Sequence, residues 1–349
     1  MRPRTWTLSA ISVLLGCAAS AAALVWFVFA LTPLAGGLGF LVTWLALFVA
    51  IYWLVERDLH GRLAATDRAA QVLIASAALT VVGALAVIIV FVAIRGAKAL
   101  RPGFFVHTLA TVGPLSKATE GGAFHAIVGT LMQVGAALVI TVPLGLFAAV
   151  FLNEIGGRFA RPVRALVDAM SGVPSIVAGL FIYSVWIVQF HNGFSGIAGG
   201  LALAVLMLPT IIRTSEEVLR LVPDGLREAS LALGAPQWRT VASVVLPTAR
   251  AGLITAMILG VARAVGETAP LIMTSFGSSV TNVNLFHAPQ AALPLFVYQL
   301  IRSPQQPQID RAWTGAFVLI LLVLILFTLA RILGRNRRAK PRRTRGATA

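Results

Sequence analysis

Charged side chains are scarce in this sequence. Only 11% of its 349 residues are Asp, Glu, Lys or Arg, and only 12 are acidic, whereas hydrophobic residues make up 58%. A soluble globular chain carries about 25% charged residues. The composition therefore excludes a soluble globular protein, and the long apolar runs predict an all-α protein that crosses the membrane several times.

Signatures of catalysis and of cofactor binding are also missing. The single cysteine, Cys17, excludes an intrachain disulfide, and its apolar surroundings are typical of a small buried hydrophobe. The sequence has no GxxxxGK[ST] loop, so the chain is not expected to hydrolyse ATP itself. No Cys/His cluster has the spacing of metal ligands, Asp168 is isolated, and no catalytic triad or carboxylate pair is present. We therefore expect a chain that is not an enzyme and binds no cofactor of its own.

Positive charge, by contrast, is abundant. The net charge of +16 raises the possibility of nucleic-acid binding, but the basic residues lie in loops and tails between apolar runs. The positive-inside rule explains this placement, so no nucleic-acid partner is expected. The tail 334–349 is basic and has no acidic residue, which predicts a cytoplasmic C-terminus. Such a tail could also hold anionic membrane lipid, at about 1 kcal/mol per basic residue. The basic loop 95–122 falls outside in this topology and runs against the rule.

Apolar runs of membrane-spanning length recur along the chain. Since a transmembrane helix needs about 20 apolar residues, the sequence predicts about eight spans, with both termini in the cytoplasm. The first two are joined by a short turn and form an N-terminal transmembrane hairpin within residues 1–60. The predicted spans are Leu8–Leu31, Gly37–Val55, Ala69–Ile94, Phe124–Leu152, Val173–Phe190, Gly196–Ile212, Ala251–Phe276 and Ala312–Ala330.

One predicted span carries charge in its interior. A charge at the bilayer centre costs about 2.5–3.5 kcal/mol on insertion scales, so such a residue usually marks a pathway or a pair. If the helix enters the membrane at Ala251, Arg263 lies roughly 18 Å further on, near the midplane. Glu267 is four residues later, close enough to pair with Arg263, and Pro270 can then kink the helix. We expect a substrate pathway here; the alternative is a static pair that locks helices together.

The segment 213–250 between two spans is the most polar internal part of the chain. It predicts a short helix from Thr214, a second one after Pro223 that Gly234 ends, and renewed helical spacing from Trp238 to Leu246. Such a loop at the cytoplasmic surface is shaped to be gripped by a partner protein, or it lies on lipid headgroups as an amphipathic helix.

This loop resembles the signature of ABC-importer permeases. Their pattern is Glu-Ala-Ala, three residues, Gly, nine residues, Ile, one residue and Leu-Pro, and the spacing here is the same, with Ser for Ala and Val for Ile. In that family the loop forms a coupling helix that docks on the cytoplasmic ATPase. The resemblance assigns this coupling role to Glu228, Ala229, Ser230, Gly234, Leu246 and Pro247, with Val244 in the place of Ile.

A second motif narrows the resemblance. The segment Arg263–Pro270 reads RAVGETAP and is similar to the RAxGETAP signature of phosphate-specific permeases. The match covers about residues 69–333 and implies a type I ABC-importer permease fold, a six-helix core to which the N-terminal hairpin and the basic tail are added. Several further segments resemble the A-type membrane subunit of these systems: Gly121–Gly122, Ile127–Thr130, Gly172–Ile176, and Pro294–Leu295 with Tyr298.

The resemblance implies a permease subunit of an ATP-driven phosphate importer in the bacterial cell membrane. Its partners would be a homologous permease subunit, a cytoplasmic ATPase dimer that uses the ATP, and an extracytoplasmic phosphate-binding protein. Arg263 would offer phosphate a charged fork, Glu267 would hold Arg263 in the absence of phosphate, and Thr268 would add a hydroxyl donor. Two alternatives stay open: a permease of the same architecture for sulfate or molybdate, and a secondary phosphate–proton symporter with Glu267 as proton carrier.

Overall fold

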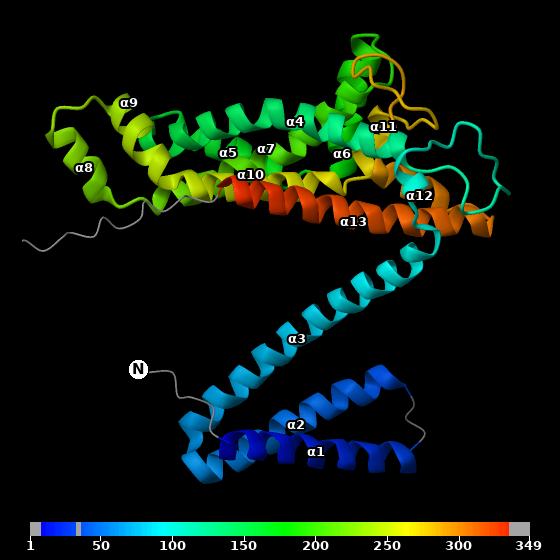
Figure 1. Cartoon of the computed structure of the whole chain (residues 1–349). Helices are drawn as coiled ribbons and strands as arrows, with labels where there is room; N and C mark the ends of the chain where they lie inside the picture. Colours follow the sequence, from blue (N-terminus) through cyan, green and yellow to red (C-terminus); the bar gives the residue numbers. More distant parts are fainter. Residues whose placement is uncertain (1–7, 33–35, 335–349) are drawn as a thin grey trace, which may run out of the picture. The chain divides into compact units, whose positions relative to one another are not determined.

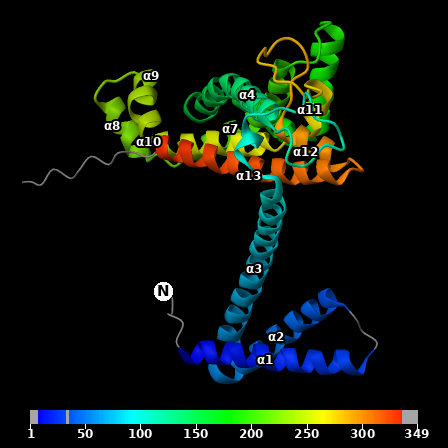
Figure 2. The same ribbon diagram turned by 45° about the vertical axis from the view of Figure 1, so that its right-hand side comes forward.

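A computed structural model describes residues 8–32 and 36–334, and the regular elements in that part of the chain are helices (Figures 1 and 2). The one β feature among the described residues is an isolated bridge between Phe276 and Gln290. The α-helices are α1 (Leu8–Leu31), α2 (Gly37–His60), α3 (Arg62–Gly96), α4 (Phe124–Val150), α5 (Ala160–Ser171), α6 (Ser175–Ile182), α7 (Gly196–Arg220), α8 (Asp224–Ala232), α9 (Gln237–Thr240), α10 (Leu246–Val265), α11 (Ala269–Thr274), α12 (Leu293–Ile301) and α13 (Gln306–Gly334). Short 3₁₀ turns cover Ala97–Ala99 and Pro102–Phe105, and π-helical turns cover Phe151–Ile155, Tyr183–Gln189 and Val241–Val245.

The lengths of these helices confirm a multi-pass membrane protein. Within the described residues, 7 helices are long and apolar enough to cross a membrane, or up to 8 if one bent pair counts as a span. The chain divides inside α3 into two compact units, Met1–Val90 and Phe91–Ala349. Of the predicted basic tail, residues 335–349 lie outside the described part of the chain.

In the first unit, α1 and α2 pack against each other. Their contact buries Cys17 and Ala21 of α1 against Phe48 and Tyr52 of α2, and Trp44 donates a 3.0 Å hydrogen bond to the carbonyl of Ala18. α2 runs beyond the predicted end at Val55. Its last turns carry Glu56, a buried carboxylate that forms ion pairs with Arg68 of α3 and, at 2.8 Å, with His60.

In the second unit, α4 and α7 run side by side, with α10 and α13 along them (Figures 1 and 2). Small residues permit this close approach: a Cβ on Gly145 of α4 would come within 2.7 Å of the Ile211 side chain of α7. Such small-residue contacts are typical of helix packing in membranes. α8 and α9 lie at one end of this unit, and α11 and α12 lie at the other (Figure 1).

One predicted span is interrupted in the structure, and another is sharply bent from the helix before it. The prediction of one helix over Ala251–Phe276 is wrong, because α10 ends at Val265 and α11 begins at Ala269. Pro270 has no N–H to donate to the carbonyl of Gly266, and its ring would clash with that carbonyl in a continuous helix. The predicted span Val173–Phe190 is continuous as α6 and the following π-helical turn, Ser175–Gln189, and a bend of 105° separates its start from α5.

The polar loop also differs at its start. A new helix was expected from Thr214, but α7 continues without a break to Arg220. The predicted helix after Pro223 is confirmed as α8, and Gly234 follows its end with φ of +80°.

Buried polar contacts hold the segment before α12 against α4. The side chain of Gln133 donates to the carbonyl of Ala291 at 3.1 Å, and the hydroxyl of Thr130 accepts a 2.7 Å hydrogen bond from the amide of Leu293. Gly129 permits the approach, since a Cβ there would lie 2.0 Å from the Ala291 carbonyl oxygen. The segment Ile127–Thr130, singled out in the sequence, is thus the part of α4 against which the segment before α12 packs.

Candidate functional site: a helix break and a coupling loop

The RAVGETAP segment forms the last turn of α10 and the break that follows it. Arg263 is exposed and donates a 3.3 Å hydrogen bond from Nη1 to the hydroxyl of Thr210 on α7. The amide of Glu267 donates to the carbonyl of Ala264 at 3.1 Å, which turns the chain, and Glu267 and Thr268 are half-buried. The break therefore presents an arginine beside a short irregular segment of backbone.

The expected pair between Arg263 and Glu267 is absent. In the part of the chain that the structure describes, neither side chain takes part in an ion pair. The spacing of four residues brings side chains together only within a continuous helix, and the helix ends two residues after Arg263. A static Arg263–Glu267 pair that locks helices together therefore does not describe this site.

Packing of α11 against α6 fixes the position of the break. A Cβ on Gly179 of α6 would lie 2.6 Å from the Cα of Pro270, so the two backbones touch. The hydroxyl of Thr274 donates to the carbonyl of Pro270 at 2.8 Å within α11. Any side chain larger than hydrogen at position 179 would push the GETAP turn away from α6.

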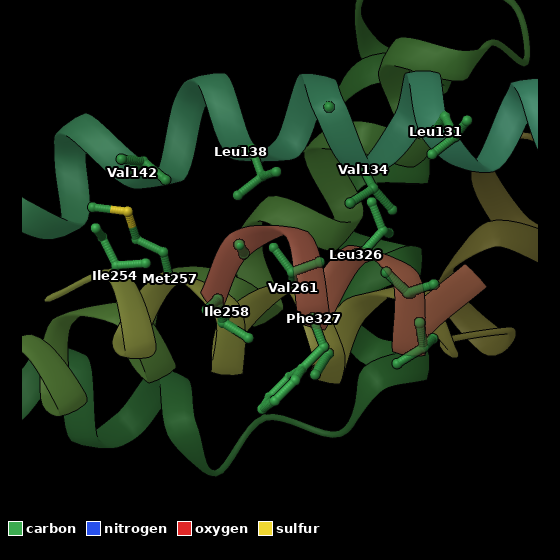
Figure 3. Close-up of a pocket in the computed structure, with 15 residues that line it drawn as sticks. Leu131, Val134, Leu138, Val142, Ile254, Met257, Ile258, Val261, Leu326 and Phe327 are labelled. Atoms are coloured by element: carbon green, nitrogen blue, oxygen red, sulfur yellow. The ribbon is translucent and has the colours of Figure 1, made fainter. Parts of the chain in front are cut away.

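The opposite side of α10 is apolar. A cavity of about 400 Å³ lies between α4, α10 and α13, and only apolar side chains or glycine line it, among them Leu138, Ile258 and Phe327 (Figure 3). Burying an ion there would cost far too much free energy without a polar partner. Val261 and Val265 face this cavity, and Arg263 is displaced from each by about 200° around the helix axis. The cavity is therefore unsuited to an oxyanion, and the arginine points elsewhere.

The coupling-loop motif begins on α8, which ends in a defined C-terminal cap. The amide of Gly234 donates to Leu231 O at 2.9 Å, and that of Ala235 donates to Ser230 O at 3.3 Å. This pair of bonds is the Schellman motif, which needs a left-handed residue at the Gly234 position. The hydroxyl of Ser230 lies 2.9 Å from that of Thr240, so serine at this place of the motif links α8 to α9.

The surface of the loop is available to a partner. Glu228, Ala229 and Gly234 are exposed, Leu246 is half-buried, and Pro247 is exposed in the first turn of α10, directly after the π-helical turn Val241–Val245. Clustered apolar exposure of this kind is typical of a protein-binding surface. The large exposed apolar side chains of the loop are Leu221, Leu226, Leu231, Leu233 and Trp238.

Gly234→Val is expected to weaken the binding of a partner protein to this loop. The left-handed conformation costs a residue other than glycine roughly 1–2 kcal/mol. The cost is greatest for a β-branched residue and small for Asn. A Cβ at this position would meet nothing within 4 Å, so the effect is one of backbone strain alone. Retention in pull-downs of the cytoplasmic ATPase that the loop resemblance implies should fall about tenfold for Gly234→Val. Gly234→Asn should retain it, and equal retention by both variants would contradict the role of this cap.

A polar cluster beneath the loop was not predicted. Arg227 of α8 binds both carboxylate oxygens of Glu154, at 2.8 and 3.2 Å, although the two residues are 73 positions apart. These hydrogen bonds hold the pKa of Arg227 above its usual value, against the lowering effect of burial. Glu154 lies in a loop on hydropathy alone, and only the π-helical continuation of α4 brings it under α8; no sequence signal reveals this pairing.

A second group of charges links α5 to α7. Glu216, only 1% exposed, accepts hydrogen bonds from Arg164 of α5 at 2.7 Å and from Arg220 at 2.6 Å. Asp168, which looks isolated in the sequence, forms an ion pair with Arg213. These ion pairs join α5 to the last turns of α7, at the end of the bundle near the loop.

Comparison with known proteins agrees with this architecture. The family model of the binding-protein-dependent transport system inner membrane component matches residues 141–339, more than half of the chain. The phosphate transport system permease protein PstA 1 of Mycobacterium tuberculosis is 46% identical over 224 residues, covering 64% of this chain and 73% of that protein. PstA of Pasteurella multocida is 38% identical over 240 residues, covering 68% and 83%.

Solved structures give the same fold. A chain of the methionine ABC transporter MetNI, in an inward-facing conformation, superposes with a TM-score of 0.50 and 23% identity, over 61% of this chain and 93% of that one. The residues that the family model matches, 141–339, include the loop motif, the helix break and α13. The chain therefore belongs to the family of binding-protein-dependent transport system inner membrane components, together with the PstA permease proteins.

Proposed function

We propose that this chain is the permease subunit of an ATP-driven importer of inorganic phosphate. The observation that carries the proposal is the Arg263 side chain, which has no carboxylate partner among the described residues and stands at a break in a membrane helix. Its relatives at 38–46% identity are named phosphate transport system permease proteins. A guanidinium suits phosphate because its planar fork matches two phosphate oxygens and stays charged at every physiological pH.

The half-buried Thr268 and the exposed Arg263 flank the break from its two sides. We assign these two residues to the phosphate pathway. Glu267, which lies between them in the sequence, takes part as a carboxylate near the pathway rather than as a fixed partner of Arg263. The apolar cavity on the other side of α10 belongs to the packing of the protein and not to the pathway.

The remaining components act as partners. The α8–α9 loop, through Glu228, Ala229 and the exposed leucines, docks on a cytoplasmic ATPase dimer, which binds and hydrolyses the ATP. A homologous permease subunit completes the pathway, and an extracytoplasmic binding protein delivers phosphate. The chain itself binds no cofactor. It lies in the bacterial inner or plasma membrane with both termini in the cytoplasm, the orientation favoured by its basic loops.

Uptake of radiolabelled phosphate by cells expressing the whole complex tests this proposal. Uptake should require ATP and should not respond to an excess of sulfate or molybdate. Competition by either anion would assign the chain to another oxyanion. Uptake that survives ATP depletion and collapses with the proton gradient would favour the symporter and would leave the coupling loop without a role.

A further inference from the structure

We propose that Glu154 and Arg227 are positioning residues that couple the orientation of α8 to the ends of α4 and α7. The inference rests on the proposed function, since it concerns how the coupling loop passes the movement of an ATPase to the membrane helices. It assigns this transmission to one ion pair rather than to the exposed face that meets the partner.

The first step is that α8 lacks an apolar anchor. No residue of α8 is buried, so the hydrophobic effect contributes little to its position. α8 is held by its chain connections, by the Ser230–Thr240 hydroxyl contact with α9 and by Arg227. A helix held in this way can be displaced as a unit unless a strong polar contact fixes it.

Arg227 supplies that contact. Besides the two bonds to Glu154, its guanidinium donates to the carbonyls of Leu219 at 2.9 Å and Val222 at 2.6 Å, and to Asp224 at 3.0 Å. The side chains of Arg227 and Glu154 are only 17% and 7% exposed. A bidentate arginine–carboxylate pair with little water access is strong and geometrically specific. Arg227 therefore joins α8 to the last turn of α7 and to the π-helical end of α4 at once.

The turn that contains Glu154 also binds α9, the second helix of the loop. The side chain of Gln237 on α9 donates to the backbone carbonyl of Glu154 at 2.6 Å, and Asn153 donates to the Glu154 carboxylate at 2.7 Å. Both arms of the loop thus converge on one turn of backbone. A pull or push on α8 is transmitted to α4, which packs along α7, and α7 carries Thr210, the hydrogen-bond partner of Arg263.

Arg227→Gln, Glu154→Gln and the double variant test the pair in the complete complex, reconstituted in proteoliposomes. The readout is the number of phosphate ions transported per ATP hydrolysed, with retention of the ATPase recorded in parallel. Each single variant should lower this ratio at least about tenfold, and the double variant should be no worse, because all three remove the same contact. Arg227→Lys should be intermediate, since lysine keeps the charge but loses the fork.

Arg220→Gln is the matched control. Arg220 lines the same surface hollow as Arg227, but its carboxylate partners, Glu216 and Glu217, belong to α7 itself. This variant should transport with the wild-type ratio. Hydrogen exchange on the purified chain gives a second readout that needs no transport: amides of α8 should exchange at least about tenfold faster in Arg227→Gln than in Arg220→Gln.

The outcomes separate the two proposals. A wild-type complex that does not import phosphate overturns the proposed function, whatever the variants do. A wild-type complex that imports phosphate, with single variants of unchanged ratio or with effects that multiply in the double variant, overturns the positioning role of the pair. Should Arg227→Gln fail to assemble, unchanged coupling and unchanged exchange in Arg227→Lys overturn it as well.

Discussion

Arg263→Gln is expected to lower phosphate uptake by the complete complex about 30-fold or more. Removing one partner of a desolvated, hydrogen-bonded charge pair costs roughly 2–5 kcal/mol, and glutamine keeps a polar but shorter side chain without the charge. The fold should survive, because Arg263 is exposed and its one hydrogen bond to a described residue goes to Thr210 at 3.3 Å. Arg263→Lys should keep part of the uptake, since it preserves the charge and loses the fork.

The control for this prediction is another exposed arginine of the same helix. Arg250 lies in the first turns of α10, near the loop, and forms no ion pair with a described residue. Uptake by Arg250→Gln should equal that of the wild type at matched membrane levels of the complex. Wild-type uptake by Arg263→Gln would remove this residue from the pathway.

The double variant Arg263→Gln with Glu267→Gln tests the broken helix directly. If the two side chains formed a buried pair, removing Glu267 would restore part of what Arg263→Gln loses, because no lone charge would be left behind. The structure shows no such pair, so the double variant should import no better than Arg263→Gln. A clear rescue would show that α10 and α11 join into one helix in some state of the transporter.

The fold could be read from the sequence as far as hydrophobicity alone decides it. Long apolar runs such as Leu8–Leu31 and Gly196–Ile212 became helices, because a backbone in lipid must satisfy its own hydrogen bonds. The interruption after Val265 could not be placed in this way, since both sides of the break are apolar. The same limit applies to α12, a largely buried helix in the segment between the last two predicted spans.

In the candidate site, too, only the features that depend on local sequence could be predicted. The loop motif was found because its spacing is local, and the structure gives physical reasons for Gly234 and Ser230. The contact between Arg263 and Thr210 and the pair between Arg227 and Glu154 join residues 53 and 73 positions apart. Such contacts depend on how helices pack, and a single sequence carries no local signal of them.

Two glycines of α4, Gly129 and Gly135, look alike in the sequence but differ in their surroundings. A Cβ on Gly129 would lie 2.0 Å from the carbonyl oxygen of Ala291, and this obstacle is backbone. A Cβ on Gly135 would meet nothing within 4 Å, because this glycine borders the apolar cavity of Figure 3. Gly129→Ala must therefore displace the segment before α12, and it should destabilise the protein by about 1–3 kcal/mol or more.

Gly135→Ala should instead leave stability unchanged or raise it by up to about 1 kcal/mol, since alanine is the better helix former and its methyl group fills free space. Thermal unfolding of the detergent-purified chain, followed by circular dichroism, measures the difference between the two variants. Because Thr130 and Gln133 bind the displaced segment, Gly129→Ala should also loosen the 2.7 Å bond to Leu293 and speed exchange of that amide. Equal unfolding temperatures for both variants would contradict the close approach of α4 to Ala291.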